Sequence, residues 1–258
     1  AVMAAAEAAD FKGKLKSMIE LLAPSKLGIG RLHLLGTGHP SELAGLDVIG
    51  LGGLAYAGLA SRKTASASLV VDVPHLASLS VAEAAAELAY GALLRSYKFS
   101  KYLTRSEDSG NGNSGGNGAG SGGKLERLIV HVESPAAAEA AFARRRALAN
   151  GVFLARDLVN EPANVLGPVE FAERARDLAR AGVEVEILDV EAMRALKMEA
   201  LLGVGQGSAK PSRMAVMQWH GARSKRAKPL CFVGKGVCFD TGGISIKPAA
   251  GMEDMKGD

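Results

Sequence analysis

The sequence predicts an α/β fold, and three observations support that class. Short apolar or alternating runs of strand length recur along the 258 residues. Alanine- and leucine-rich stretches with helical spacing lie between these runs. Glycine and proline clusters separate the two kinds of segment. Strands that alternate with helices are typical of a sheet covered by helices.

In the first half of the chain, the clearest predicted element is a helix over Val81–Tyr97. Its residues are mostly alanine, leucine and glutamate, and Ser80 and Glu83 have the spacing of a capping box. Helical spacing of apolar and basic residues also predicts a helix over Phe11–Leu22. The strands expected in this half are Arg31–Leu35, Leu46–Leu51, Ser68–Val73 and Lys124–Val132.

The second half begins with a long predicted helix, Ala136–Val159, which Pro162 ends. Another helix begins at Pro168 and closes at Gly182, and Asp189 can cap a short helix. Strands are expected at Val183–Leu188, Arg213–Trp219 and Leu230–Val233, and the last of these has the length of a buried central strand.

Two domains follow from this order of elements, residues 1–150 and residues 151–258. Residues 108–123 are mostly glycine, serine and asparagine, so we expect a flexible surface insertion there. Gly118–Lys124 has the glycine and lysine spacing of a phosphate-binding loop. However, Leu125 stands where a metal-binding Ser or Thr is needed, so we reject that interpretation.

Composition sets broad limits on function. Hydrophobic content is 48%, charged content is 22% and the net charge is +4, which is too mild to indicate nucleic-acid binding. The basic runs Arg144–Arg146 and Arg223–Lys228 are interpreted as solvated surface. Cys231 and Cys238 are expected to be buried free thiols. The most apolar window, Leu43–Ala60, lacks a clean membrane span and is interpreted as buried strand and loop.

The candidate functional residues lie close together in the last part of the sequence. They are Lys235, Asp240, Lys247 and Asp258, which follow the expected strand at Leu230–Val233. Active sites of open α/β sheets collect just past the carboxyl ends of such strands. Glycines between these residues allow tight turns. Two carboxylates and two lysines around a glycine-rich loop suit a hard-cation site with an electrophilic lysine beside it.

This stretch resembles the metal-binding segment of the M17 leucyl, or cytosol, aminopeptidases through VGKG, FD, GGISIKP, GM and MKGD. GALLRSYKFSKY, RDLVNEPAN and ALLGVGQGSAKPSRMAVMQWHG are similar to the same family in the same order. The resemblance covers about residues 25–258. It implies a macro-like N-terminal domain followed by an incomplete α/β catalytic domain of the zinc-exopeptidase type.

The resemblance also implies roles for individual residues. Lys235 would donate its amine to one metal, Asp240 would bridge two metals, and Asp258 would join the metal bound by Lys235. Lys247 would polarise the scissile carbonyl of the substrate. Met255 would line the pocket for the first side chain of the substrate, so Met255, Lys247 and Asp258 are the expected substrate-binding residues.

The implied activity is two-metal release of N-terminal amino acids, leucine favoured, from peptide substrates. Two divalent ions are expected, zinc or manganese, with magnesium or cobalt as alternatives. The complete enzyme would be cytoplasmic and hexameric, without membrane contact, and nucleic acid is not an expected partner.

Two more acidic ligands and an arginine that holds bicarbonate lie on the family's NTDAEGR motif, which this sequence does not contain. We therefore expect the chain alone to be inactive. The alternative is a non-catalytic assembly or nucleic-acid-binding module that acts through the N-terminal domain.

Overall fold

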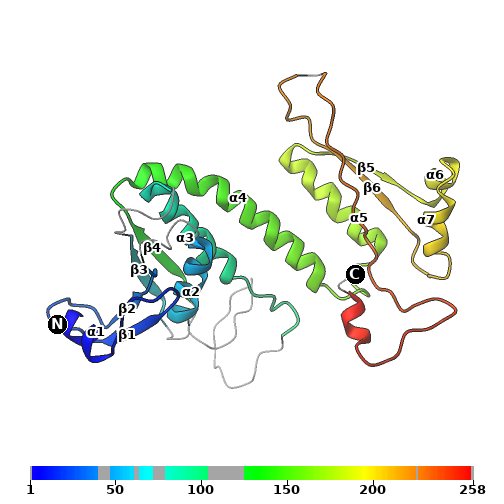
Figure 1. The fold of residues 1–258 in the computed structure, drawn as a ribbon. Coiled ribbons are helices and arrows are strands. Elements are labelled where there is room, and N and C mark those ends of the chain that lie inside the picture. The colour runs from blue at the N-terminus through cyan, green and yellow to red at the C-terminus, as the bar shows by residue number, and fades with distance from the viewer. Residues whose placement is uncertain are drawn as a thin grey trace, which may run out of the picture. The chain divides into compact units, whose positions relative to one another are not determined.

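The computed structural model describes residues 2–39, 47–60, 64–71, 79–103, 125–224 and 226–256. The chain divides into two compact units, Ala1–Leu154 and Ala155–Asp258. Helices and strands alternate in both units, which confirms the α/β class (Figure 1). The expected insertion at 108–123 and the rejected phosphate loop before Leu125 lie outside the described residues.

The first unit is built around a parallel strand pair. β3 (Ser66–Val70) pairs with β4 (Arg127–His131), and α3 (Val81–Arg95) lies between them in sequence. Parallel neighbours need a crossover connection of this kind. The remaining elements are α1 (Val2–Ala8), the antiparallel pair β1 (Met18–Leu22) and β2 (Arg31–Leu35), α2 (Val48–Ala60), and α4 (Pro135–Asn160), which crosses the boundary between the units.

Helix α2 occupies the window where a strand at Leu46–Leu51 and a loop were expected, so that prediction was wrong. Two glycines, Gly52 of α2 and Gly91 of α3, serve the packing of these helices against each other. A Cβ on Gly52 would collide with the carbonyl oxygen of Leu88, and a Cβ on Gly91 would collide with that of Ile49. The two helices can therefore approach closely only because both positions lack a side chain.

The predicted helix over Phe11–Leu22 was also wrong, because Met18–Leu22 forms strand β1 against β2. Gly13 and Lys16 have φ values of 65° and 61°, in the left-handed region that a right-handed helix excludes. The apolar spacing of this segment therefore serves cross-strand pairing. Leu21, for example, lies opposite Leu32.

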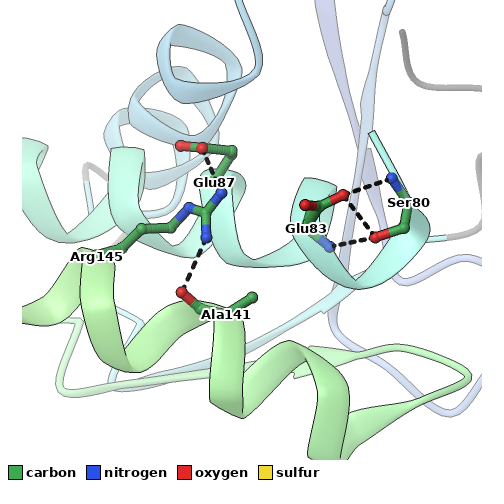
Figure 2. Close-up of polar contacts among 5 residues, drawn as sticks. All are labelled: Ser80, Glu83, Glu87, Ala141 and Arg145. Carbon is green, nitrogen blue, oxygen red and sulfur yellow. Dashed lines mark hydrogen bonds and ion pairs between the residues drawn. The ribbon is translucent and has the colours of Figure 1, made fainter. Parts of the chain in front are cut away.

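Helix α3 begins as predicted (Figure 2). The Ser80 hydroxyl accepts a hydrogen bond from the backbone N–H of Glu83 at 3.2 Å, and the Glu83 carboxylate accepts one from the Ser80 N–H at 3.0 Å. This capping box satisfies two of the backbone donors that every helix leaves free at its start. The pKa of Glu83 is lowered chiefly by the Ser80 backbone donor and then by the Ser80 hydroxyl.

One member of the basic run Arg144–Arg146 is not solvated surface. Arg145 donates to Glu87 of α3 at 2.6 Å and to the Ala141 carbonyl at 2.9 Å (Figure 2). The Arg145 and Glu87 side chains are only 18% and 20% exposed. The pair therefore ties α4 to α3, and only Arg144 and Arg146 present their side chains to solvent.

The second unit contains an antiparallel strand pair and short helices. β5 (Glu184–Leu188) pairs with β6 (Met214–Gln218), close to the predicted strands. Gly182 closes the preceding helical segment with a φ of 85°, and Asp189 caps the next helix by accepting from the Ala192 N–H at 2.9 Å. The other elements are α5 (Pro168–Arg176), η2 (Asp177–Ala181), α6 (Val190–Ala195), α7 (Glu199–Val204) and η3 (Met252–Lys256).

The segment Leu230–Val233 is not the buried strand that was predicted. Phe232 is 90% exposed and Val233 is 96% exposed, and no strand of the described part of the chain pairs with them. An apolar run forms a strand only when a neighbouring backbone completes its hydrogen bonds. Cys231 lies in this unpaired segment and is exposed, so the expectation that it is buried was wrong. Cys238 is half-buried, and both cysteines are free thiols. Burial raises the pKa of Cys238.

None of the described helices combines the length and the apolar character that a membrane span requires.

Candidate metal centre

The predicted site residues lie on the turn that follows the exposed segment Leu230–Val233, and on η3. Lys235 is exposed, whereas Asp240, Lys247 and Met255 are partly buried. Asp258, the fifth residue of the prediction, lies outside the described residues. The structure therefore describes four of the five predicted residues. Three of these, Asp240, Lys247 and Met255, are in direct contact.

A tight turn over residues 240–247 places Asp240 and Lys247 side by side. Gly242 has a φ of 92°, and a Cβ there would collide with the backbone carbonyl oxygen of Ser245. The Gly242 N–H donates to Asp240 Oδ1 at 2.9 Å. The Lys247 N–H donates to the Thr241 carbonyl at 3.0 Å and closes the turn. A glycine at position 242 is therefore required by both the backbone angle and the close approach.

The Lys247 ammonium joins the turn to η3. Its Nζ atom lies 3.0 Å from Asp240 Oδ2 and 3.0 Å from the Met255 sulfur. The Asp240 N–H also donates to the Met255 carbonyl at 3.4 Å. The Lys247 and Asp240 side chains are 35% and 40% exposed, so solvent reaches both. An anion, a cation and a thioether thus meet at one partly open position.

The electrostatics of this group favour an ionised carboxylate. The pKa of Asp240 is lowered first by the hydrogen bond from the Gly242 N–H and then by the hydrogen bond from Lys247. The positive charges of Lys247 and Lys235 lower it further, whereas partial burial opposes the shift. Lys235 is therefore close enough to act on Asp240 electrostatically. A carboxylate that stays anionic at neutral pH is the kind of ligand a hard divalent cation prefers.

Two lysines that were not among the predicted site residues bind carbonyl groups at the end of α4 and just after it. Lys256, the last residue of η3, donates to the Leu158 carbonyl at 3.2 Å, near the carboxyl end of α4. Lys210 donates to the Ala163 carbonyl at 2.9 Å. Leu158 lies in the last turn of α4, where cations are favoured because the carbonyl groups lack helical partners, whereas Ala163 lies just after the helix. Lys256 belongs to the MKGD motif and Ala163 to the NEPAN motif. A motif read along the sequence does not show which distant residue each of them contacts.

The donor set of the described residues fits a divalent cation only in part. Asp240 supplies a carboxylate, and Lys235 could supply an amine after losing its proton. The part of the chain that the structure describes contains no cluster of three or more His, Cys, Asp or Glu residues able to hold a metal ion. Asp258 and further ligands would have to complete the coordination.

The fold and the site together define a two-unit α/β protein that carries a carboxylate-and-lysine centre in its second unit. Family models match both units. The N-terminal domain of the cytosol aminopeptidase family matches residues 1–106, and the catalytic domain of that family matches residues 153–258. The chain therefore belongs to the cytosol aminopeptidase family, M17, as the motifs predicted.

Individual relatives agree with the family models. The chain is 49% identical over 257 residues to a probable cytosol aminopeptidase of Rhodopseudomonas palustris (strain ATCC BAA-98 / CGA009), covering 100% of this chain and 49% of the relative. Among solved structures, it is similar to the bottromycin maturation enzyme BotP in complex with Mn, with a TM-score of 0.73 and 25% identity, covering 100% of this chain and 50% of BotP. A mutant of tomato leucine aminopeptidase matches with a TM-score of 0.64 and 26% identity, over 83% of this chain and 40% of that one. The chain thus spans about half the length of the relatives it matches.

Proposed function

We propose that this chain forms part of a metal-dependent aminopeptidase that releases N-terminal amino acids, leucine favoured, from peptides. The observation that carries the proposal is the contact of Lys247 with both Asp240 and Met255. These residues come from separate motifs of the family's catalytic segment, and the fold brings them to one position. The Mn-bound structure of the similar protein BotP supports a divalent metal.

In this proposal the carboxylates of Asp240 and Asp258 and the amine of Lys235 hold the cations, which are zinc or manganese, with magnesium or cobalt as alternatives. When bound, the cations supply Lewis acidity and an activated water for hydrolysis. Lys247 donates a hydrogen bond to the oxygen of the scissile carbonyl as negative charge develops there. Met255 contacts the first side chain of the substrate, and its unbranched thioether suits apolar side chains such as leucine.

The proposal extends to the complete protein. Two further acidic ligands and the arginine that would hold bicarbonate belong to a motif that these 258 residues do not contain. We therefore propose that the chain alone does not hydrolyse peptides, and that the complete enzyme is a cytoplasmic hexamer. For the binding-module alternative, the basic run Arg144–Arg146 of the N-terminal domain offers only two exposed arginines, because Arg145 is paired with Glu87.

A hydrolysis assay tests the proposal. The chain, alone and co-expressed with a polypeptide matching the second half of the Rhodopseudomonas relative, is incubated with Mn²⁺ or Zn²⁺ and leucine 4-nitroanilide. We expect hydrolysis only with the second polypeptide, and loss of that hydrolysis on Lys247→Ala or Asp240→Asn. The Lys228→Met variant, which removes an exposed lysine outside the site, is the matched control. Hydrolysis that survives Asp240→Asn, or a DNA gel shift without any hydrolysis, would contradict the proposal.

A further inference from the structure

The segment Leu230–Val233 exposes apolar side chains along its whole length. The exposed fractions of Leu230, Phe232 and Val233 are 86%, 90% and 96%, and Cys231 between them is exposed as well. When such a segment is extended, successive side chains point to opposite sides, so each side of this run is apolar. A strand that is apolar on both sides is typical of the interior of a sheet whose two faces are covered.

The backbone of this segment also lacks partners. No hydrogen bond in the described part of the chain involves a backbone group of Leu230–Val233. The sheet of the same unit contains only the two strands β5 and β6. Two strands alone are marginally stable, and a sheet gains stability from a third strand or more. The second unit therefore has an unpaired segment of strand length and a sheet with few strands.

Two isoleucines in the turn that follows are exposed to a similar degree. Ile246 is 77% exposed, and Ile244 is as exposed as a residue in a free peptide. Burial of these two side chains together with Leu230, Phe232 and Val233 would remove on the order of 300–600 Å² of apolar surface from water. Apolar patches of this size on a protein surface mark interaction sites.

From these observations we infer that Leu230–Val233 is the docking surface for a second polypeptide, which adds a β-strand along each edge of this segment. The family's catalytic-domain model includes the segment, and the chain spans about half the length of the relatives it matches. The partner is therefore a polypeptide that matches the second half of those relatives. The inference rests on the proposed function, which joins the chain to such a polypeptide, and it adds the place and the mode of binding.

Two other occupants fit the segment less well. Basic residues precede it, namely Arg223, Arg226 and Lys228, and a basic and apolar surface can bind an anionic membrane. However, lipid cannot complete the hydrogen bonds of an extended backbone, whereas a neighbouring strand completes them residue by residue. A second copy of this chain would pair with one edge of the segment and leave the other edge open.

The test is capture of the partner by the affinity-tagged 258-residue chain, co-expressed with the second half of the Rhodopseudomonas relative. We expect this polypeptide to co-purify with the unmodified chain and with Phe232→Leu, which stays apolar. Phe232→Asp should reduce the captured amount by about tenfold or more, because a charge would be buried between strands. Leu103→Asp removes a side chain that is 71% exposed in the first unit and should leave capture unchanged.

The fold of each variant is checked on the chain alone. Because Phe232 is 90% exposed there, Phe232→Asp should leave the circular dichroism spectrum and the melting temperature unchanged. Leu230→Asp stands in if that variant does not fold. Hydrogen exchange then tests the mode of binding. We expect the amides of Cys231, Phe232 and Val233 to exchange at least about tenfold more slowly in the complex than in the chain alone.

Several results would overturn the inference. They are failure of the unmodified chain to capture the polypeptide, equal capture by Phe232→Asp, and unprotected amides in the complex. If the segment instead mediates a dimer of the chain alone, or binding to phosphatidylserine vesicles, the occupant is a second copy or a membrane and the inference is wrong. Hydrolysis of leucine 4-nitroanilide is scored separately. A complex that forms through Phe232 without hydrolysis contradicts the proposed function alone, whereas hydrolysis that survives Phe232→Asp contradicts the docking alone.

Discussion

The ion pair between Arg145 and Glu87 gives a quantitative test of how the first unit is held together. Its atoms lie 2.6 Å apart, and both side chains are about four-fifths buried. A hydrogen bond between charged groups contributes about 1.5–3 kcal/mol, and removal of one partner leaves the other poorly solvated. We therefore expect Arg145→Met, which keeps the apolar stem, and Glu87→Ala each to lower the free energy of unfolding by about 1.5–3 kcal/mol.

A double-mutant cycle isolates the pair itself. The single variants, the double variant and the exposed control Arg146→Met are compared by urea unfolding monitored by circular dichroism. Hydrogen exchange of the α3 and α4 amides then assigns the loss to the first unit. We expect a coupling energy of about 1–2 kcal/mol and a change below about 0.5 kcal/mol for the control. A coupling energy near zero would mean that the pair behaves like an exposed surface pair, and the reasoning from its burial would be wrong.

Three further predictions follow from single contacts. Lys256→Met should weaken Mn²⁺ binding several-fold without a change in melting temperature above about 3 °C, because η3 loses its bond to α4; unchanged affinity would refute a positioning role. Gly91→Ala should lower the free energy of unfolding in urea by about 1–3 kcal/mol, because the added Cβ forces α2 and α3 apart. Gly151→Ala, at a position of α4 with open space around it, should be neutral or stabilising. Equal effects of the two substitutions would refute the packing argument. Because the folded-state pKa of Glu83 is lowered, its contribution to stability is present above about pH 5 and is lost as the pH falls through that lowered pKa. Ser80→Ala should make the free energy of unfolding depend less on pH between pH 6 and pH 3. An unchanged pH dependence would contradict the role of this capping box.

The sequence predicted those elements whose boundaries depend on local chemistry. The capping box at Ser80, the left-handed Gly182 and the cap at Asp189 each involve residues within a few positions of one another. The wrong predictions concern segments whose structure depends on residues far away in the sequence. Gly52 and Gly91 are explained only by contacts between two helices, and Met18–Leu22 only by pairing with β2. Apolar spacing shows that a segment will be buried, but the partner decides whether it becomes a helix or a strand.

The same distinction applies to the candidate site. Asp240 and Lys247 were predictable as neighbours because one short turn carries both, and η3 follows a few residues later. Lys256 was missed because its partner, the Leu158 carbonyl, is 98 positions away in the sequence. Lys210 was missed for the same reason, with a partner 47 positions away. Motifs therefore identify the residues proposed to act on the substrate more readily than residues such as Lys256 and Lys210, whose partners lie far away in the sequence.

The charges of the described site explain why it needs more ligands than these residues supply. Lys235 and Lys247 carry two positive charges and Asp240 carries one negative charge, so the three together are positive when both lysines are protonated. In the proposed metal site, a divalent cation would meet these charges at an electrostatic cost. Each added carboxylate, beginning with that of Asp258, lowers this cost. In the proposed metal site, the affinity for a cation would therefore depend on the balance between the acidic ligands and the positive charges of Lys235 and Lys247.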